Sequence, residues 1–239
     1  VKKKIGLGTW AWGNKLFWNY KQINNGELKE TFQEALKRGF AFIDTADSYG
    51  TGNLEGLSEK LLGQFLSEVP NSKLKKIEVA TKLAPYPWRF GKKGFETPFL
   101  NSYERLNKRL DIVQLHWSTA RYNPWQEFQL LTNLCDLIDK GYKFKIGISN
   151  IGPERLKKII VFLSQRNQKI ASVQVQFSLL SPNLKKQLQV KKVCDQNNIS
   201  FYAYSPLSFG LLTKDPSNDF VEGNSLLRQY LFQIYNKPT

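Results

Sequence analysis

Four side chains that could together move a proton lie near the ends of neighbouring predicted strands. Asp44 closes one apolar run, Lys82 closes the next, and His116, the only histidine, closes the one after it. Tyr49 follows Asp44 by five residues, in a predicted loop. Because adjacent parallel strands lie about 4.8 Å apart, side chains at neighbouring strand ends can touch. We therefore expect these four side chains to converge on one spot.

The chemistry that these residue types suggest is proton delivery to a carbonyl oxygen. A free tyrosine has a pKa of about 10 and is a poor acid at neutral pH, but an ammonium beside the phenol favours the phenolate. Lowering the pKa of Tyr49 to about 8 would take about 3 kcal/mol. Asp44 would hold Lys82 charged, and His116 would orient the substrate oxygen. No side chain can supply a hydride, so a nicotinamide cofactor is implied.

Each of the four residues also has an ordinary structural explanation. Asp44 alone fits a turn or a helix N-cap, and Lys82 fits a lysine whose stem lies along an apolar surface. A lone histidine at a strand end is more often structural than catalytic, and Tyr49 by itself predicts nothing. Their joint occurrence at successive strand ends favours the catalytic interpretation.

Short β-branched runs alternate with amphipathic stretches and supply the elements that position these residues. Strands are expected over residues 4–9, 40–44, 77–82, 112–116, 144–149, 172–177 and 200–204, and helices near residues 27–38, 57–67, 99–108, 125–140, 153–165, 184–197 and 225–235. Such alternation indicates right-handed βαβ units in a doubly wound sheet or a barrel. No GxGxxG follows the first strand, and polar residues recur at strand ends. Both points favour an α/β fold of the (β/α)8 TIM-barrel type, with about seven units in this sequence.

The composition fits one globular domain over residues 1–239, which we expect to be incomplete at its C-terminal end. The net charge is +15, and the basic residues are scattered rather than gathered in an arm or tail. Solvated lysine-rich helix faces explain this charge better than nucleic-acid binding, which no motif supports. The net positive charge would also help to steer an anionic cofactor toward the protein.

Three further expectations concern metals, membranes and compartment. Cys135 and Cys194 form neither a CxxC pair nor a Cys/His cluster, so no metal site is expected. The apolar runs are too short to span a bilayer, and the N-terminus leaves no room for a secretory signal. We therefore expect no membrane partner and a cytoplasmic location.

Seven segments, in order, resemble the aldo/keto reductase superfamily. They are residues 6–10, 42–50, 79–82, 111–117, 146–150, 173–178 and 203–207, with the sequences GLGTW, FIDTADSYG, VATK, DIVQLHW, IGISN, VQVQFS and AYSPL. Each segment alone is a weak signal, but seven in the right order are a strong one. The resemblance extends from Gly6 to about Thr213.

This resemblance implies reduction of an aldehyde or ketone to the alcohol, with NADPH preferred over NADH. Tyr49 would be the acid, supported by Lys82, Asp44 and His116. The cofactor would be bound by Gly8, Thr9, Trp10, Ser149, Asn150, Gln174, Tyr204, Ser205, Pro206 and Leu207. Trp10, Trp88 and Trp117 would wall the substrate pocket, although simple aromatic packing explains them equally well.

The resemblance departs from the family after residue 213. The eighth strand and its helix, which in the family carry the basic residues for the 2′-phosphate of the cofactor, are absent from this sequence. We expect an incomplete representation of an active protein, because the four catalytic positions are intact. The alternative is a cofactor-binding redox sensor or partner-docking subunit with little turnover. Neither the particular carbonyl substrate nor the oligomeric state is predicted.

Overall fold

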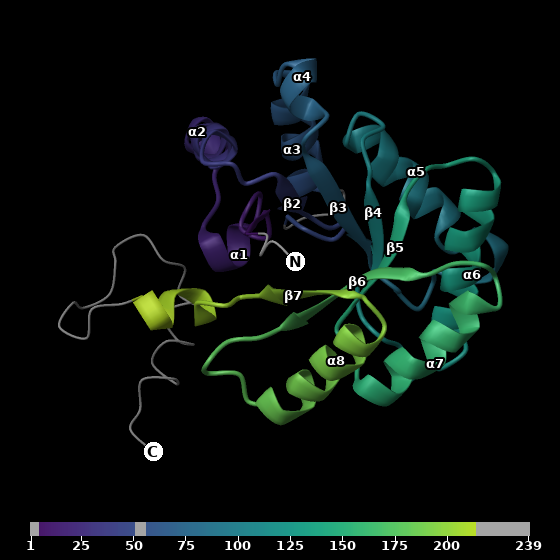
Figure 1. Ribbon diagram of the computed structural model, residues 1–239. Coiled ribbons are helices and arrows are strands. Elements are labelled where there is room, and N and C mark those ends of the chain that lie inside the picture. Colours follow the sequence, from purple (N-terminus) through teal and green to yellow (C-terminus); the bar gives the residue numbers. More distant parts are fainter. Residues whose placement is uncertain (1–4, 51–55, 214–239) are drawn as a thin grey trace.

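Seven parallel strands form a single sheet in the order β1-β2-β3-β4-β5-β6-β7. The computed structural model describes residues 5–50 and 56–213 (Figure 1). The strands are β1 (Gly6–Gly8), β2 (Phe42–Asp44), β3 (Glu78–Leu83), β4 (Ile112–Leu115), β5 (Lys145–Ser149), β6 (Ile170–Gln176) and β7 (Ser200–Tyr204). Every neighbouring pair is parallel, so a helical crossover must connect each strand to the next.

The helices lie on the outer side of the sheet and connect its strands (Figure 1). They are α1 (Lys15–Trp18), α2 (Asn25–Lys37), α3 (Leu57–Ser67), α4 (Asn71–Leu74), α5 (Glu96–Arg105), α6 (Gln126–Asp139), α7 (Pro153–Ser164) and α8 (Leu184–Gln196). Three short 3-10 helices complete the described part, namely η1 (Gln22–Asn24), η2 (Gly91–Lys93) and η3 (Ser208–Thr213). No helix in the described ranges combines the length and the apolar character needed to cross a membrane.

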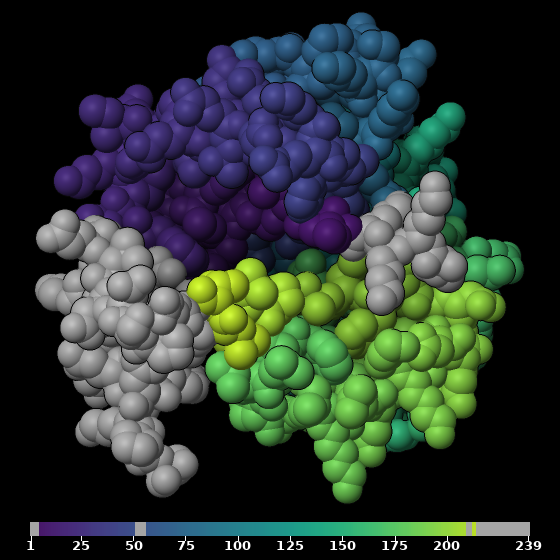
Figure 2. Space-filling view, turned by 60° about the vertical axis from the view of Figure 1, so that its left-hand side comes forward, coloured from purple at the N-terminus to yellow at the C-terminus, as the bar shows by residue number. Residues whose placement is uncertain are grey.

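The sheet curves until its two ends come close together. Figure 2 shows the N-terminal residues beside the last described residues on one face of the molecule. Among the described strands, β1 pairs only with β2 and β7 pairs only with β6, so the barrel is nearly but not fully closed. This arrangement confirms the predicted TIM-type barrel with seven of its eight units. The helix expected over residues 225–235 lies outside the described residues.

The differences from the predicted elements are small and local. β1 contains only three residues, and β6 begins at Ile170, two residues earlier than expected. The helices α1 and α4 were not predicted, because four residues are too few for a helical apolar period to appear. The start of α1 is stabilised by an N-cap, because the Asn14 side chain accepts a hydrogen bond from the backbone N of Phe17 at 2.9 Å.

An apolar layer inside the barrel supports the residues above it. Phe42, Ala80 and Ile112, from three adjacent strands, form a buried cluster. The Tyr202 ring of β7 stacks on the Phe42 ring, with 4.6 Å between the centroids, and so connects opposite parts of the sheet. Because side chains alternate between the two faces of a strand, the inward residue two positions after Phe42 is Asp44. The next inward layer is therefore polar and lies toward the carboxyl ends of the strands.

Candidate active site

Lys82 is the centre of this polar layer. Its Nζ donates one hydrogen bond to Asp44 Oδ2 at 2.6 Å and another to the carbonyl oxygen of Thr45 at 2.7 Å. Lys82 is only 1% exposed. Asp44 lies beside Ala80 in the register of β2 and β3. Lys82 is the next residue of β3 that points into the barrel, so the long Lys82 side chain reaches back to the Asp44 carboxylate. A charge buried this deeply is tolerated because it is paired and hydrogen-bonded.

Gln114 is a member of this layer that the sequence analysis missed. It lies beside Lys82 in the register of β3 and β4, and its Nε2 donates to Asp44 Oδ1 at 3.1 Å. Gly147 on β5 leaves the space for it, because a Cβ there would lie 2.7 Å from Gln114 Cγ. The sequence signal that could have revealed Gln114 is its amide side chain in the middle of the apolar run before His116.

Tyr49 folds back over the mouth of the barrel toward Lys82. The Lys82 Nζ lies 4.7 Å from the centroid of the Tyr49 ring. The Tyr49 and His116 rings pack edge to face, with 5.6 Å between their centroids. The structure therefore brings the side chains of Asp44, Tyr49, Lys82 and His116 together at the carboxyl ends of β2, β3 and β4.

The pKa of Tyr49 moves in the direction opposite to the expected one. Burial raises it above its ordinary value of 10.0, and the positive charge of Lys82 opposes this rise without cancelling it, while Asp44 adds to it. The expected lowering of the phenol's pKa is therefore wrong for this structure, because that expectation left out the loss of hydration around a buried phenolate. Tyr49 holds its proton at neutral pH.

Lys82 and His116 keep opposite charge states in the same surroundings. Burial disfavours the Lys82 ammonium, but its electrostatic interactions and hydrogen bonds with Asp44 and Tyr49 together outweigh burial and raise its pKa. For His116, burial together with the charges of Lys82 and Arg89 lowers the pKa to about 3. The site thus contains a phenol with its proton, a permanent ammonium and a neutral imidazole. Such a set can give a proton to an oxygen and can hydrogen-bond that oxygen.

The carboxyl ends of β5, β6 and β7 place a second polar group beside His116. The Tyr204 hydroxyl donates to Asn150 Oδ1 at 2.8 Å, and Asn150 Nδ2 donates to Ser149 Oγ at 3.2 Å and to the carbonyl oxygen of His116 at 3.1 Å. The buried Gln174 lies beside Ser149 in the strand register. Amide and hydroxyl groups that both donate and accept suit the carboxamide of a nicotinamide, so these residues fit the predicted cofactor.

Gly8 and Thr9 lie at the end of β1, next to Asp44. The Thr9 hydroxyl is fully buried, donates to the carbonyl oxygen of Asp44 at 3.1 Å and accepts from Ser58 Oγ at 2.7 Å. Thr9 thus fastens the strand end that carries Asp44, and its side chain is not presented to a ligand. Gly8 is exposed and leaves open space, with no atom within 4 Å of a Cβ built there.

The predicted turn of Ser205, Pro206 and Leu207 follows β7 directly. Pro206 and Leu207 are exposed, and Ser205 has a positive φ of 49°. The next residue, Ser208, donates from Oγ to Ser178 Oγ at 2.7 Å and anchors the turn to the segment after β6. The turn is therefore held beside Tyr204 with its outer side open.

Two of the three predicted pocket tryptophans belong to one aromatic surface beside His116. The Trp117 ring lies 5.1 Å from the His116 ring, and Tyr86 packs edge-on to Trp117 at 5.8 Å. Trp88 stacks on Tyr86 at 4.7 Å and is 63% exposed. We call Tyr86, Trp88 and Trp117 the aromatic wall. Tyr86 was missed because one tyrosine in a Pro-rich loop gives no sequence signal.

The third predicted tryptophan, Trp10, has its ring contacts in another group. It packs against Phe17 at 5.3 Å and edge-on to Trp18 at 6.1 Å, both in the segment that contains α1. For Trp10, the alternative of aromatic packing within a loop has direct support.

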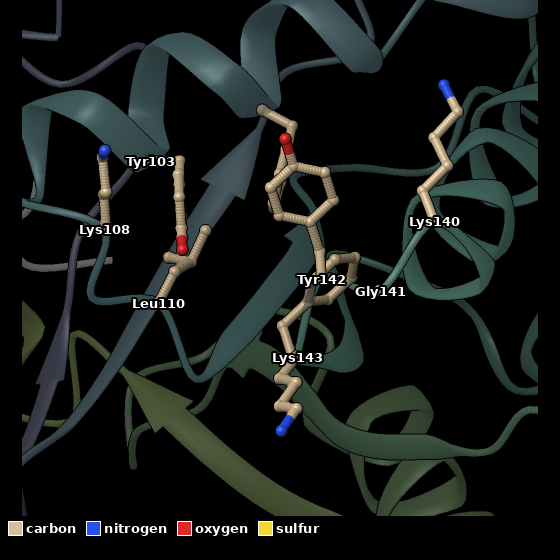
Figure 3. Close-up of a pocket in the computed structure, with 9 residues that line it drawn as sticks. Tyr103, Lys108, Leu110, Lys140, Gly141, Tyr142 and Lys143 are labelled. Carbon is tan, nitrogen blue, oxygen red and sulfur yellow. The ribbon is translucent and has the colours of Figure 1, made fainter.

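A hollow of about 450 Å³ (Figure 3) lies at the amino ends of β4 and β5, whereas Lys82 lies near the carboxyl end of β3. Its walls are residues at the start of β4 and β5 and at the end of α5 and α6. The Lys143 side chain on its rim points away from those of Lys108 and Lys140 (Figure 3). Lys108 faces Glu104 and Lys140 pairs with Glu96. The hollow gathers no converging charge and takes no part in the site. Over residues 5–50 and 56–213, no group of three or more His, Cys, Asp or Glu side chains could hold a metal ion.

Two known proteins with similar sequences are named as reductases. A plant relative, "Pyridoxal reductase, chloroplastic" of Arabidopsis thaliana, is 47% identical over 212 residues, which are 87% of this chain and 58% of the relative. The "NADH-specific methylglyoxal reductase" of Escherichia coli is 28% identical over 253 residues, 98% of this chain and 72% of the relative. The chain thus spans less than two thirds of the plant relative's length.

A solved structure supports the same fold. The aldo/keto reductase from Brucella melitensis superposes with a TM-score of 0.62 over 88% of this chain and 70% of that one, at 23% identity. The sequence model of the Aldo/keto reductase family matches residues 4–230, nearly the whole chain. Together with the barrel and the predicted motifs on its strand ends, this match shows that the chain belongs to the aldo/keto reductase family.

Proposed function

We propose that this chain reduces an aldehyde or ketone to the alcohol, with NADPH as the hydride source. The observation that carries the proposal is the contact of Lys82 with both the Asp44 carboxylate and the Tyr49 ring, next to a neutral His116. A bound nicotinamide supplies the hydride that the carbonyl carbon receives. The carbonyl oxygen receives a proton, so that the C=O group becomes CH–OH.

Tyr49 is the proton donor in this proposal. Its raised pKa keeps the phenol protonated until the carbonyl oxygen becomes basic. As the proton leaves, the Lys82 ammonium stabilises the new phenolate, an interaction that strengthens in the transition state. Asp44 keeps Lys82 charged and aimed, and the N–H of the neutral His116 donates to the same substrate oxygen.

The cofactor is proposed to lie across the ends of β5, β6 and β7. Ser149, Asn150 and Gln174 would hold the carboxamide, and Tyr204 would stack on the ring. NADPH over NADH is the proposed preference, and the ratio of kcat/KM for the two cofactors tests it, because one relative is named as NADH-specific. A cytoplasmic location and a single domain over residues 1–239 are also proposals, and one relative is named as chloroplastic.

A Tyr49→Phe variant tests the proposed reaction. Loss of the phenol proton should lower the rate of carbonyl reduction by about 10²–10⁴, the usual contribution of a general acid. Steady-state oxidation of NADPH with a panel of aldehydes measures it in the intact protein. Cofactor binding, followed by quenching of tryptophan fluorescence, should stay within error of the parent.

Two outcomes would contradict this assignment. If the variant reduced carbonyls as fast as the parent, Tyr49 would not be the acid. If the parent bound NADPH but turned over none of the aldehydes, the alternative of a cofactor-binding sensor would replace the reductase.

We further propose a flat aromatic aldehyde, such as pyridoxal, as the substrate. Two observations support this class: the identity of 47% with a pyridoxal reductase, and the aromatic wall that continues from His116 to the exposed Trp88. An offset-stacked ring pair contributes about 0.5–1.5 kcal/mol. Trp88→Ala should therefore lower kcat/KM for pyridoxal about 2- to 10-fold and leave that for methylglyoxal, which has no ring, unchanged. An equal loss for both substrates would contradict a stacking role.

A further inference from the structure

Ser48, the residue before Tyr49, contacts the imidazole of the only histidine. Its Oγ lies 3.2 Å from His116 Nδ1. In the described part of the chain, this is the one hydrogen-bond partner of the His116 side chain. A neutral imidazole has one N–H and one lone pair, so its use depends on which nitrogen bears the proton. A partner on Nδ1 decides what Nε2 can offer to a substrate.

We propose that Ser48 is a positioning residue that donates its hydroxyl proton to His116 Nδ1 and so fixes the tautomer with the proton on Nε2. This inference rests on the proposed function of the site. In that tautomer the imidazole donates a hydrogen bond to the carbonyl oxygen. In the other tautomer a lone pair on Nε2 would face the lone pairs of that oxygen and repel it.

Ser48 also has a second polar neighbour, the phenol of Tyr86. Burial raises the pKa of the Tyr86 phenol and the interaction with Ser48 opposes this rise, so the phenol is neutral at pH 7. In the proposed arrangement this neutral phenol donates to Ser48 Oγ, which leaves the serine's own proton for His116 Nδ1. The hydrogen bonds then run one way, from Tyr86 through Ser48 to His116.

The turn that carries Ser48 is fastened on both sides of the neighbouring strand end. The backbone N of Asp47 donates to the carbonyl oxygen of Lys82 at 3.0 Å, and the Asp47 carboxylate accepts from the backbone N of Ala84 at 3.2 Å. Arg89 donates to the same carboxylate and to the carbonyl oxygen of Ala84. Ser48 therefore has little freedom to turn away from the imidazole.

The imidazole itself is also held in one orientation. The Tyr49 ring contacts it edge to face, and the Trp117 ring lies at 48° to it on a centroid distance of 5.1 Å. These contacts fix the plane of the ring, and the contact of Ser48 Oγ with Nδ1 defines which edge of the imidazole faces the serine. The proton position is then the remaining variable, and Ser48 controls it.

The single histidine makes the tautomer directly measurable. In the intact protein labelled with ¹⁵N-histidine, the imidazole shows one pair of ring-nitrogen signals. We expect a protonated Nε2 and an unprotonated Nδ1 in the parent, a mixture of tautomers in Ser48→Ala, and a parent-like spectrum in Ser48→Thr, which keeps the hydroxyl. Ser67→Ala is the matched control, because the exposed Ser67 hydroxyl donates to the carbonyl oxygen of Gln64, away from His116.

Turnover supplies the second measurement. Loss of one neutral hydrogen bond should lower kcat for aldehyde reduction in Ser48→Ala about 3- to 10-fold, with the KM for NADPH unchanged. A parent with the proton on Nδ1, or a Ser48→Ala variant with a parent-like tautomer, would overturn the inference. If the parent reduces no carbonyl at all, the proposed function fails, yet the spectrum still decides what Ser48 does.

Discussion

At the scale of single residues, the site is defined by how burial acts on three ionisable groups. The same loss of hydration raises the pKa of the Tyr49 phenol and lowers that of the His116 imidazole, because in each case the neutral form is favoured. Of the three, only Lys82 stays charged, since its interactions with Asp44 and Tyr49 together outweigh its burial. A single cation beside two neutral hydrogen-bond donors suits a reaction in which negative charge develops on oxygen.

The depressed pKa of His116 predicts how activity responds to pH. An imidazole with a pKa of about 3 does not titrate between pH 5 and 8, whereas an ordinary one has a pKa of 6.5. The Hε1 chemical shift of this single histidine should therefore stay constant over that range. The pH profile of kcat/KM should show no inflection from His116 between pH 5 and 8. A titration of the signal near pH 6.5 would contradict the burial of the ring.

The same group makes folding stability depend on pH. The folded pKa of His116 lies below its unfolded value of 6.5. Its contribution is therefore fully present above about pH 6.5 and is lost as the pH falls toward 3. Asp47 acts oppositely, because burial raises its pKa to about 6. The contribution of Asp47 is the same in the parent and in a His116→Gln variant, so it cancels when the two are compared. Between pH 6.5 and 3, the free energy of unfolding should therefore fall less in the variant than in the parent.

At the scale of elements, the packing of α3 against the end of α5 is unusually close. A Cβ built on Gly63 would lie 1.9 Å from the carbonyl oxygen of Arg105, and the Asn107 side chain donates to the carbonyl oxygen of Gly63 at 2.7 Å. The buried Glu59 pairs with Arg105 across the same contact, at 2.6 Å. Both helices are thus locked beside the strands that carry Asp44 and Lys82.

Gly63→Ala should destabilise the protein although alanine favours helices. The backbone oxygen of Arg105 cannot move aside as a side chain would, so overpacking should cost about 1–3 kcal/mol of unfolding free energy. Gly26 in α2 is the matched control, because no atom lies within 4 Å of a Cβ there. Gly26→Ala should gain up to about 1 kcal/mol. Urea unfolding measures both, and equal effects would contradict the close helix contact.

The order and type of the long elements could be predicted from the sequence. All seven strands and the helices of ten or more residues lie where apolar periodicity indicates them, with ends shifted by a few residues. The helices α1 and α4 were missed because each is only one turn long. Periodicity cannot reveal an element shorter than its own repeat.

At the scale of the whole molecule, the curvature of the sheet brings the carboxyl ends of its strands together at one site. Asp44 and His116 are far apart in the sequence, yet both contact Tyr49 or Lys82 because parallel strands end at one face of the barrel. The apolar layer of Phe42, Ala80 and Ile112 closes the barrel below them. The hollow at the amino ends of β4 and β5 shares none of these residues.

The sequence by itself determined the barrel class, the family resemblance and the four residues that meet at the mouth, because periodicity and strand-end positions are local properties of the chain. Only the tertiary structure decided the direction of the Tyr49 pKa shift and the places of Gln114, Ser48 and Tyr86. These depend on burial and on contacts between distant segments, such as the hydrogen bond from Gln114 to Asp44. Hydration and neighbouring charge are set by the packed fold, and no spacing along the chain encodes them.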